Sequence, residues 1–153
     1  MTQTLTVPND QQAPVAPGCA DERVVTLARP LLGFPASRRF VLHGLDEQLA
    51  PFLGLRSLDQ PGLRFVVVAP GAFFSDYVLE IDDAEVELLG LRGCEDVEVL
   101  VLVTAAPGTT PTVNLMGPLV INRRTDVATQ VVLQDGTYAA AVPLDAPSAR
   151  RSV

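Results

Sequence analysis

Residues 97–104 read Val-Glu-Val-Leu-Val-Leu-Val-Thr, and this run decides the fold class. Val favours extended backbone, because a β-branched side chain packs well on a pleated surface. Glu98 is the only charged side chain in the run, so the alternation of polar and apolar residues stops after its first positions. This pattern is typical of a strand that is covered on both faces. The acids at positions 95, 96 and 98 are expected to flank the strand as charges that oppose aggregation.

Similar short runs rich in Val, Ile, Leu, Phe and Thr continue on both sides, bounded by Gly, Pro and Asp. Two turn signals, at residues 59–62 and 134–136, are each predicted to join two adjacent strands. Hairpins repeated at this spacing favour an antiparallel barrel or a sandwich. We therefore predict an all-β fold, mainly antiparallel and barrel-like and small. The predicted strands are 23–27, 39–42, 52–58, 63–69, 77–81, 97–104, 112–122, 129–133 and 137–143.

One short helix is predicted near residues 82–89. Asp82 and Asp83 suit an N-cap and the positive end of a helix dipole. Gly90 suits the position just after the helix, where left-handed backbone is common. Val86 and Leu89 are spaced to pack on the barrel, so Glu85 and Glu87 are expected to point mainly outward.

A chain of 153 residues is most simply one domain, which we place at residues 21–145. Residues 1–20 are polar and rich in Pro, which predicts a loose arm, with a short strand at residues 5–7. Residues 146–153 are predicted to form a loose tail. The two cysteines, Cys19 and Cys94, are far apart and show no metal-binding spacing. They are read as free thiols rather than as a disulfide, which favours a cytoplasmic location. No run is apolar and long enough to suggest a membrane segment.

Charge is concentrated in one part of the chain. The 11 basic residues are all Arg, against 18 acids, for a net charge of −7. Residues 76–98 hold nine of the acids and one Arg, a net charge of −8, so the rest of the chain is almost neutral. This segment is either a solvated rim or a surface that attracts a basic partner. The net charge and the scattered Arg pairs argue against direct binding of nucleic acid.

The residues offer little catalytic equipment. The absence of Lys excludes Schiff-base chemistry and Walker A phosphate binding. His43 is the only histidine, no Ser lies in a nucleophile-elbow motif, and the acids lack calcium-loop spacing. We therefore predict no enzyme activity, no metal and no cofactor. A hydrolase that uses paired carboxylates stays open as a minor alternative.

Two segments carry residues with a possible binding role. In the first, Phe73 and Phe74 are adjacent, so in extended backbone one of them is expected to be exposed. In the second, Asn114 and Asn122 bracket an apolar run that contains Met116, an adaptable contact residue, and Pro118, which belongs at a sheet edge, a bulge or a strand entry. The second segment is read either as an edge strand with hydrogen bonds at its ends or as a docking edge for a protein partner. The residues alone do not favour one over the other.

The order of these features resembles the flagellar assembly factor family FliW. The resemblance covers residues 23–143 and is most specific in the Asn-Leu-x-x-Pro-Leu-Val-Ile-Asn run at 114–122. The chain departs from the family pattern at Leu53, where an aromatic residue is common, and at Pro35, Ala69 and Ser75. The further motifs that carry it are Leu31-Leu-Gly-Phe34, Arg39-Phe-Val-Leu42, Leu58-Asp-Gln-Pro61, Leu63-Arg-Phe-Val-Val-Val-Ala-Pro70, Phe73-Phe-Ser-Asp-Tyr77, Leu88-Leu-Gly90, Glu95–Thr104 and Gln130-Val-Val-Leu133.

The resemblance implies a small barrel-like protein without catalytic activity, which binds flagellin in the cytoplasm as a chaperone. It also implies binding to CsrA, an RNA-binding translational regulator, which relieves repression of flagellin translation. The departures keep a second reading open, in which a β-barrel adaptor has changed its partners. Candidate contact residues for basic CsrA are the helix acids Asp82, Asp83, Glu85 and Glu87. Candidates for a docking edge are Asn114, Met116, Pro118 and Asn122.

Overall fold

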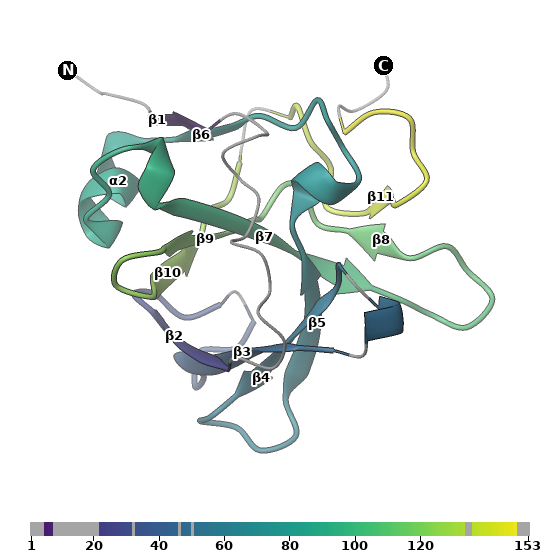
Figure 1. The fold of residues 1–153 in the computed structure, drawn as a ribbon, viewed down its shortest axis with the longest axis horizontal. Coiled ribbons are helices and arrows are strands. Elements are labelled where there is room, and N and C mark those ends of the chain that lie inside the picture. The colour runs from purple at the N-terminus through teal and green to yellow at the C-terminus, as the bar shows by residue number, and fades with distance from the viewer. Residues whose placement is uncertain are drawn as a thin grey trace.

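Seven strands close into a barrel in the computed structural model, which describes residues 5–7, 22–31, 33–45, 47–49, 51–133 and 136–149 (Figure 1). Each strand in the order β7-β5-β4-β3-β2-β10-β9 pairs with the next, and β9 pairs again with β7. The pair β2–β10 is parallel and the other barrel pairs are antiparallel. The predicted barrel-like β fold is confirmed. The barrel strands are β2 (Arg23–Leu27), β3 (Arg39–Gly44), β4 (Leu53–Ser57), β5 (Arg64–Val68), β7 (Val97–Thr104), β9 (Leu119–Asn122) and β10 (Val127–Gln130).

Strand β7 is covered on both faces, as its sequence predicts. Leu100 faces the barrel interior, where it packs with Phe40, Leu55 and Ile121. Val99, on the opposite face of the strand, belongs to a second hydrophobic core outside the barrel wall. Both residues have no exposed surface, so burial on two sides explains why the run is almost entirely apolar.

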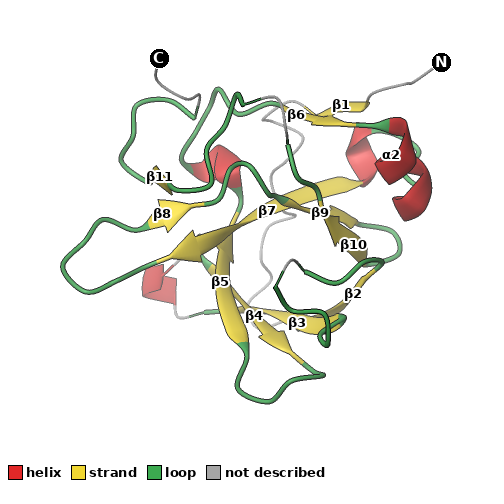
Figure 2. Cartoon of the chain, turned by 180° about the vertical axis from the view of Figure 1, so that it is seen from behind, coloured by secondary structure: helices red, strands yellow, loops and turns green. Residues whose placement is uncertain are grey.

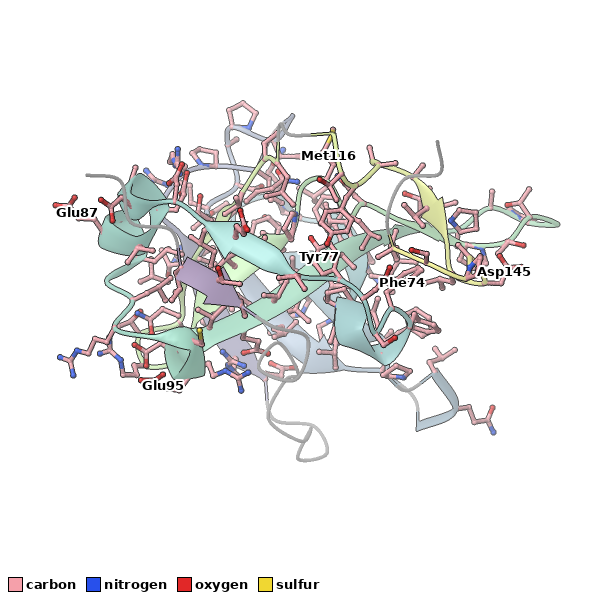
Figure 3. The ribbon with its side chains drawn as sticks, turned by 90° about the horizontal axis from the view of Figure 1, so that it is seen from above. Phe74, Tyr77, Glu87, Glu95, Met116 and Asp145 are labelled. Atoms are coloured by element: carbon pink, nitrogen blue, oxygen red, sulfur yellow. The ribbon has the colours of Figure 1, made fainter. Side chains whose placement is uncertain are left out.

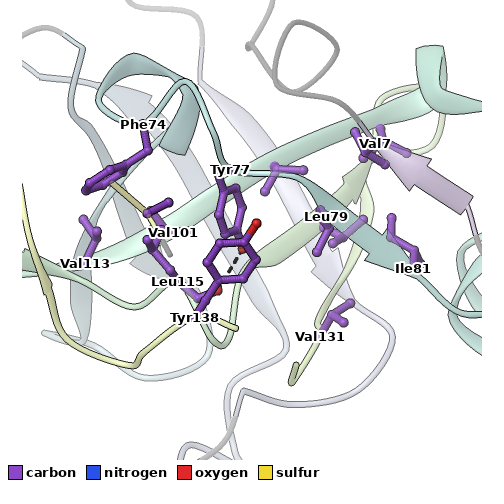
Figure 4. Packing of buried hydrophobic residues seen from close by; sticks show 14 of the residues in the cluster. Val7, Phe74, Tyr77, Leu79, Ile81, Val101, Val113, Leu115, Val131 and Tyr138 are labelled. Carbon is purple, nitrogen blue, oxygen red and sulfur yellow. Dashed lines mark hydrogen bonds between the residues drawn. The ribbon is translucent and has the colours of Figure 1, made fainter. Parts of the chain in front are cut away.

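The second core lies under a layer that is not part of the barrel. This layer contains the pair β1 (Leu5–Val7) and β6 (Leu79–Ile81), and a C-terminal segment that includes β11 (Val142–Pro143) (Figure 2). Tyr77 and Tyr138 pack within this core with ring centroids 4.5 Å apart (Figure 4). The Tyr77 hydroxyl donates to the Leu115 carbonyl at 2.8 Å, and burial raises the pKa of this tyrosine. The outer layer is therefore anchored by buried aromatic side chains.

The predicted strand over residues 112–122 is instead two strands, β8 (Thr112–Val113) and β9, which both pair with β7. From Val103 to Leu100 of β7 the partner residue changes from Val113 to Leu119, so the chain between β8 and β9 has three residues more than β7. These extra residues form a loop that bulges out of the sheet. Pro118 stands at the entry to β9, one of the places expected for it. The edge-strand reading is wrong for β9, because β7 and β10 pair with it on its two sides.

Two other expectations about strands differ from the structure. The strands predicted at 129–133 and 137–143 do not form a hairpin, since β10 pairs with β9 and β2, whereas β11 pairs with β8. The C-terminal segment instead pairs with β8 and packs on the second core, so it takes no part in closing the barrel. The other turn, at residues 59–62, does join β4 to β5 as predicted. Strand β6 begins at Leu79, and the 3-10 helices are η1 (Glu47–Leu49), η2 (Pro70–Ala72) and η3 (Cys94–Asp96).

The predicted helix is present as α2 (Asp83–Leu89). The Asp82 side chain accepts a hydrogen bond from the Glu85 amide at 3.0 Å, which caps the first turn. Gly90 has a φ of 67°, so the helix ends in the left-handed conformation that glycine adopts readily. Leu89 is buried and faces the second core.

The C-terminal segment is attached as far as Ala149, although the sequence suggests a loose tail from residue 146. The Ala149 amide donates to Asp76 at 2.9 Å, and the Ser148 hydroxyl donates to the same carboxylate. Ala149 is buried within the second core. In the N-terminal arm, β1 occupies the strand position expected at residues 5–7, and the Cys94 thiol donates to the Thr6 carbonyl. Residues 1–4, 8–21 (with Cys19) and 150–153 lie outside the described part of the chain.

None of the helices in the described part of the chain has the length and apolar character needed to span a bilayer.

Candidate partner-binding surfaces

The acids of residues 76–98 divide into a buried set and an exposed set. Asp96 and Glu98 are buried, so in the folded protein these two acids are not solvated charges beside β7. Asp76 is half-buried and binds the C-terminal segment. The exposed or half-exposed acids without an ion pair to another described residue are Glu80, Asp82, Asp83, Glu87 and Glu95.

The predicted contact acids of the helix therefore differ in their availability. Asp82 is committed to capping α2. Glu85 is only 14% exposed in its side chain and forms an ion pair with Arg29, so it does not point freely outward as expected. Asp83 is half-buried, whereas Glu87 is exposed and projects from α2 at one end of the molecule (Figure 3). Glu87 is the acid of this set best placed to meet a partner.

Asp96 stabilises the start of β7. Its carboxylate accepts from the Arg92 amide at 2.9 Å and from Arg124 Nε at 3.0 Å. The hydrogen bond from the Arg92 amide, with the charge and hydrogen bond of Arg124, lowers the pKa of Asp96. The charged form is therefore favoured more strongly in the folded state than in the unfolded chain.

This lowered pKa predicts acid sensitivity. Above the unfolded-state pKa of about 3.9, the stabilisation from Asp96 is fully present, and it is lost as pH falls through the lower folded-state pKa. We expect Asp96→Asn to be less stable than the wild type at neutral pH, with a difference that shrinks below about pH 4. Urea unfolding across this pH range measures the effect, with Asp145→Asn, at an exposed site, as the control. A difference that is constant with pH would contradict the assignment.

Glu98 is the most deeply buried acid of the segment, with 2% of its side chain exposed. Arg23 donates to Glu98 at 2.8 Å and to Asp126 at 2.7 Å, and so connects β2, β7 and the turn before β10. Burial acts to lower the pKa of Arg23, but its bonds to Glu98 and Asp126 outweigh this and raise it. These charges stabilise the barrel and are not available to a partner.

The predicted docking residues around β9 also serve the fold. The Asn114 side chain accepts from the amides of Met116 and Gly117 at 3.1 and 2.9 Å, which shapes the bulge between β8 and β9. Asn122 has no exposed surface; its amide group donates to the Leu89 carbonyl at 2.8 Å and so attaches β9 to the end of α2. Pro118 is buried. Asn114 and Met116 remain partly exposed, but Met116 lies apart from Glu87 in Figure 3.

An open groove on the outer face of the barrel was not foreseen from the sequence. It has a volume of about 590 Å³, and its described lining contains two arginines and one histidine but no acid. Leu49, Phe52 and Val66 supply apolar surface to the groove. Arg56 and Arg64, which lie opposite each other on β4 and β5, supply its positive charge. The sequence does contain a signal for this arrangement, because Arg56 and Arg64 are placed about the predicted turn at 59–62 so that a hairpin brings them opposite each other.

His43 lies in this groove, and its Nδ1 is 3.2 Å from the Gly44 carbonyl. The groove does not contain the paired carboxylates that the hydrolase alternative requires, since its lining has no acidic residue. Among the described residues, no three His, Cys, Asp or Glu side chains gather in a way that could hold a metal ion.

Comparisons with known proteins agree with the fold and extend it. A sequence model described as FliW protein matches residues 11–144. The flagellar assembly factor FliW of Bacillus licheniformis is 38% identical, over 81% of this chain and 87% of that protein. The flagellar assembly factor FliW of Bacillus subtilis is 35% identical, over 84% of this chain and 90% of that protein. A crystal structure of the flagellar assembly factor FliW aligns with a TM-score of 0.72 and 34% identity, over 79% of this chain and 84% of that one.

Proposed function

Because the chain belongs to the FliW family of flagellar assembly factors, we propose that it binds flagellin in the cytoplasm as a chaperone and also binds the translational regulator CsrA. Binding of CsrA would relieve repression of flagellin translation. The protein acts in this scheme by binding alone, without catalysis. Its family membership places it in flagellar assembly, and these two partners are the specific part of the proposal.

The exposed acids around α2 are the observation that supports CsrA binding. A protein that binds RNA carries basic surface, because its ligand is a chain of phosphates. Glu80, Asp83, Glu87 and Glu95 offer negative charge that no described basic side chain neutralises. Opposite charges on two proteins speed their encounter and fix their orientation.

We expect Glu87→Arg to slow association with CsrA about threefold to tenfold at low ionic strength, with little change in the dissociation rate. Glu87 is exposed, and it lies near the negative end of the α2 dipole, so a basic residue there does not weaken the helix. Association is measured by stopped-flow mixing of this protein with CsrA from the same cell, at several salt concentrations.

The matched control is Asp145→Arg. Asp145 is also exposed, and Figure 3 places it at the other end of the molecule from Glu87, so this variant makes the same change in net charge at a distant site. Equal association rates for the two variants would show that only net charge matters, and would remove α2 as the contact surface. Binding of the wild-type protein to neither flagellin nor CsrA by calorimetry would overturn the proposed function.

A further inference from the structure

The pairing register of four neighbouring barrel strands places the residues of the groove side by side. His43, Gly54, Val66 and Val103 are directly paired in that order across β3, β4, β5 and β7. Their neighbours Leu42, Leu55 and Val67 face the barrel interior, so this row faces outward. Gly54 contributes no side chain, which leaves room on the outer face for the side chain of the adjacent His43.

The backbone at Gly54 is also in close contact with the neighbouring strand. A Cβ atom at this position would lie 2.3 Å from Cε1 of His43, so the imidazole ring rests against the strand. Glycine is required here by that contact rather than by its backbone conformation, because Gly54 is not among the residues with positive φ. Part of the floor of the groove is therefore the imidazole ring of His43, which lies flat against β4 at Gly54.

The groove exposes apolar surface that has no cover in the described structure. Leu49 is 51% exposed and Val66 is 38% exposed. Phe52, also in the lining, packs on the exposed Phe73 with ring centroids 5.6 Å apart, which extends the apolar surface beyond the groove. Contiguous apolar surface on a folded domain is typical of an interaction site.

Two guanidinium groups add positive charge to this apolar surface. Arg56 and Arg64 are direct cross-strand partners on β4 and β5, and like charges in that arrangement repel. Glu22 lies 3.3 Å from Arg56, but Arg64 has no ion pair with any described residue. An anion bound beside Arg64 would relieve this repulsion. The groove is thus a positively charged site on a protein whose net charge is −7, and a ligand of complementary charge carries an acidic group.

We propose that this groove docks an apolar peptide segment of a protein partner whose carboxylate side chains meet Arg64 and Arg56. A peptide fits better than a fatty acid, because the groove is open along the barrel wall and would leave a bare alkyl chain in water. In Figure 1, α2 lies on one side of the barrel and the β5 strand and the 3-10 helix η1 on the other, so this site is separate from the acids of α2. The proposal does not depend on which partners bind at α2.

The test uses a fluorescein-labelled synthetic helical peptide with leucines at positions i, i+3, i+4 and i+7 and two glutamates at one end. We expect saturable binding to the full chain by fluorescence anisotropy. Arg64→Glu should weaken this binding about tenfold or more, because it places a carboxylate against the peptide's own acids. Val66→Ser should weaken it about threefold to tenfold by removing apolar contact.

Arg92→Glu is the matched control, since Arg92 is exposed, lies outside the groove and undergoes the same charge reversal. Arg64 is exposed, so the fold should tolerate its replacement, and circular dichroism with thermal unfolding checks that it does. The proposal is overturned if the peptide does not bind, if both charge reversals weaken it equally, or if a peptide with lysine in place of glutamate binds as well. Displacement of the peptide by dodecanoate at concentrations below those needed for peptide binding would overturn it in favour of a lipid.

Binding of flagellin and of CsrA is then measured by titration for the wild-type protein and for the Arg64→Glu and Glu87→Arg variants. If the wild-type protein binds neither flagellin nor CsrA, the proposed function is refuted, and the peptide result still stands. Peptide binding that fails while flagellin and CsrA still bind would refute only the groove.

Discussion

Replacing Arg23 with methionine should lower the free energy of unfolding by about 3 kcal/mol, which is among the largest effects expected of any single change in this protein. The reason is that the Glu98 carboxyl group, with 2% of its side chain exposed, would be left buried without the guanidinium that lies 2.8 Å away. We place the effect at the lower end of the range for a broken buried ion pair, because Arg23 itself is 33% exposed. Urea unfolding monitored by circular dichroism measures it.

A double variant separates the lost attraction from the cost of the remaining charge. Arg23→Met combined with Glu98→Leu should recover most of the stability, since neither charge is then left buried and unpaired. The matched control is Arg39→Met, which removes an exposed arginine 3.1 Å from Asp59 and should cost much less than Arg23→Met, because solvent screens this pair. If Arg23→Met costs no more than Arg39→Met, the buried pair does not stabilise the barrel.

Tyr77→Ala should lower the free energy of unfolding by about 4 kcal/mol, as for other large aromatic side chains removed from a core. Tyr77 has no exposed surface, packs on Tyr138 and connects the outer layer to the bulge before β9 through the Leu115 carbonyl. The variant should also make the C-terminal segment more sensitive to proteolysis, because that segment packs on the same core. Urea unfolding and limited proteolysis measure the two effects.

Two further variants divide this effect into its parts. Tyr77→Phe keeps the ring and should cost about 1–2 kcal/mol, because it leaves the Leu115 carbonyl without its donor. Phe73→Ala removes a neighbouring aromatic side chain that is 36% exposed, and should cost much less than Tyr77→Ala. Equal losses for Phe73→Ala and Tyr77→Ala would contradict the role of Tyr77 as an anchor of the outer layer.

The two proposed binding surfaces differ in charge and in their place on the barrel. The acids around α2 suit a basic protein, whereas the groove beside Arg64 suits an acidic apolar segment. The two surfaces share no residue.

Several elements of the fold could be predicted because local chemistry specifies them. The helix near 82–89 has an acid that caps its first turn and a glycine that ends it, and both act within a few residues. The β4–β5 hairpin follows from a turn signal flanked by two apolar runs. One residue of the Phe73–Phe74 pair is exposed as predicted, and it is Phe73, but the backbone there follows a 3-10 turn rather than the extended conformation on which the prediction relied.

The predictions failed at one local turn that was overlooked, and at two acids whose roles depend on distant parts of the chain. The run 112–122 looks like one strand, but the loop after Val113 leaves the sheet because Asn114 binds the amides that follow it. Asp96 and Glu98 look like surface charges, but Arg124 approaches Asp96 from the turn between β9 and β10, and Arg23 approaches Glu98 from β2. Such pairings join residues separated by tens of positions, and no local pattern encodes them.

The sequence by itself determined the all-β class, the helix, the two-sided burial of β7 and the family to which the chain belongs, since these depend on side-chain type and short-range order. Tertiary structure alone decided which acids are free and which are internal, because that depends on which arginines fold against them. It also decided the groove, because His43, Gly54 and Val66 become neighbours only through strand register. The charge of residues 76–98 is thus a property of the sequence, but the part of it that a partner can meet is a property of the fold.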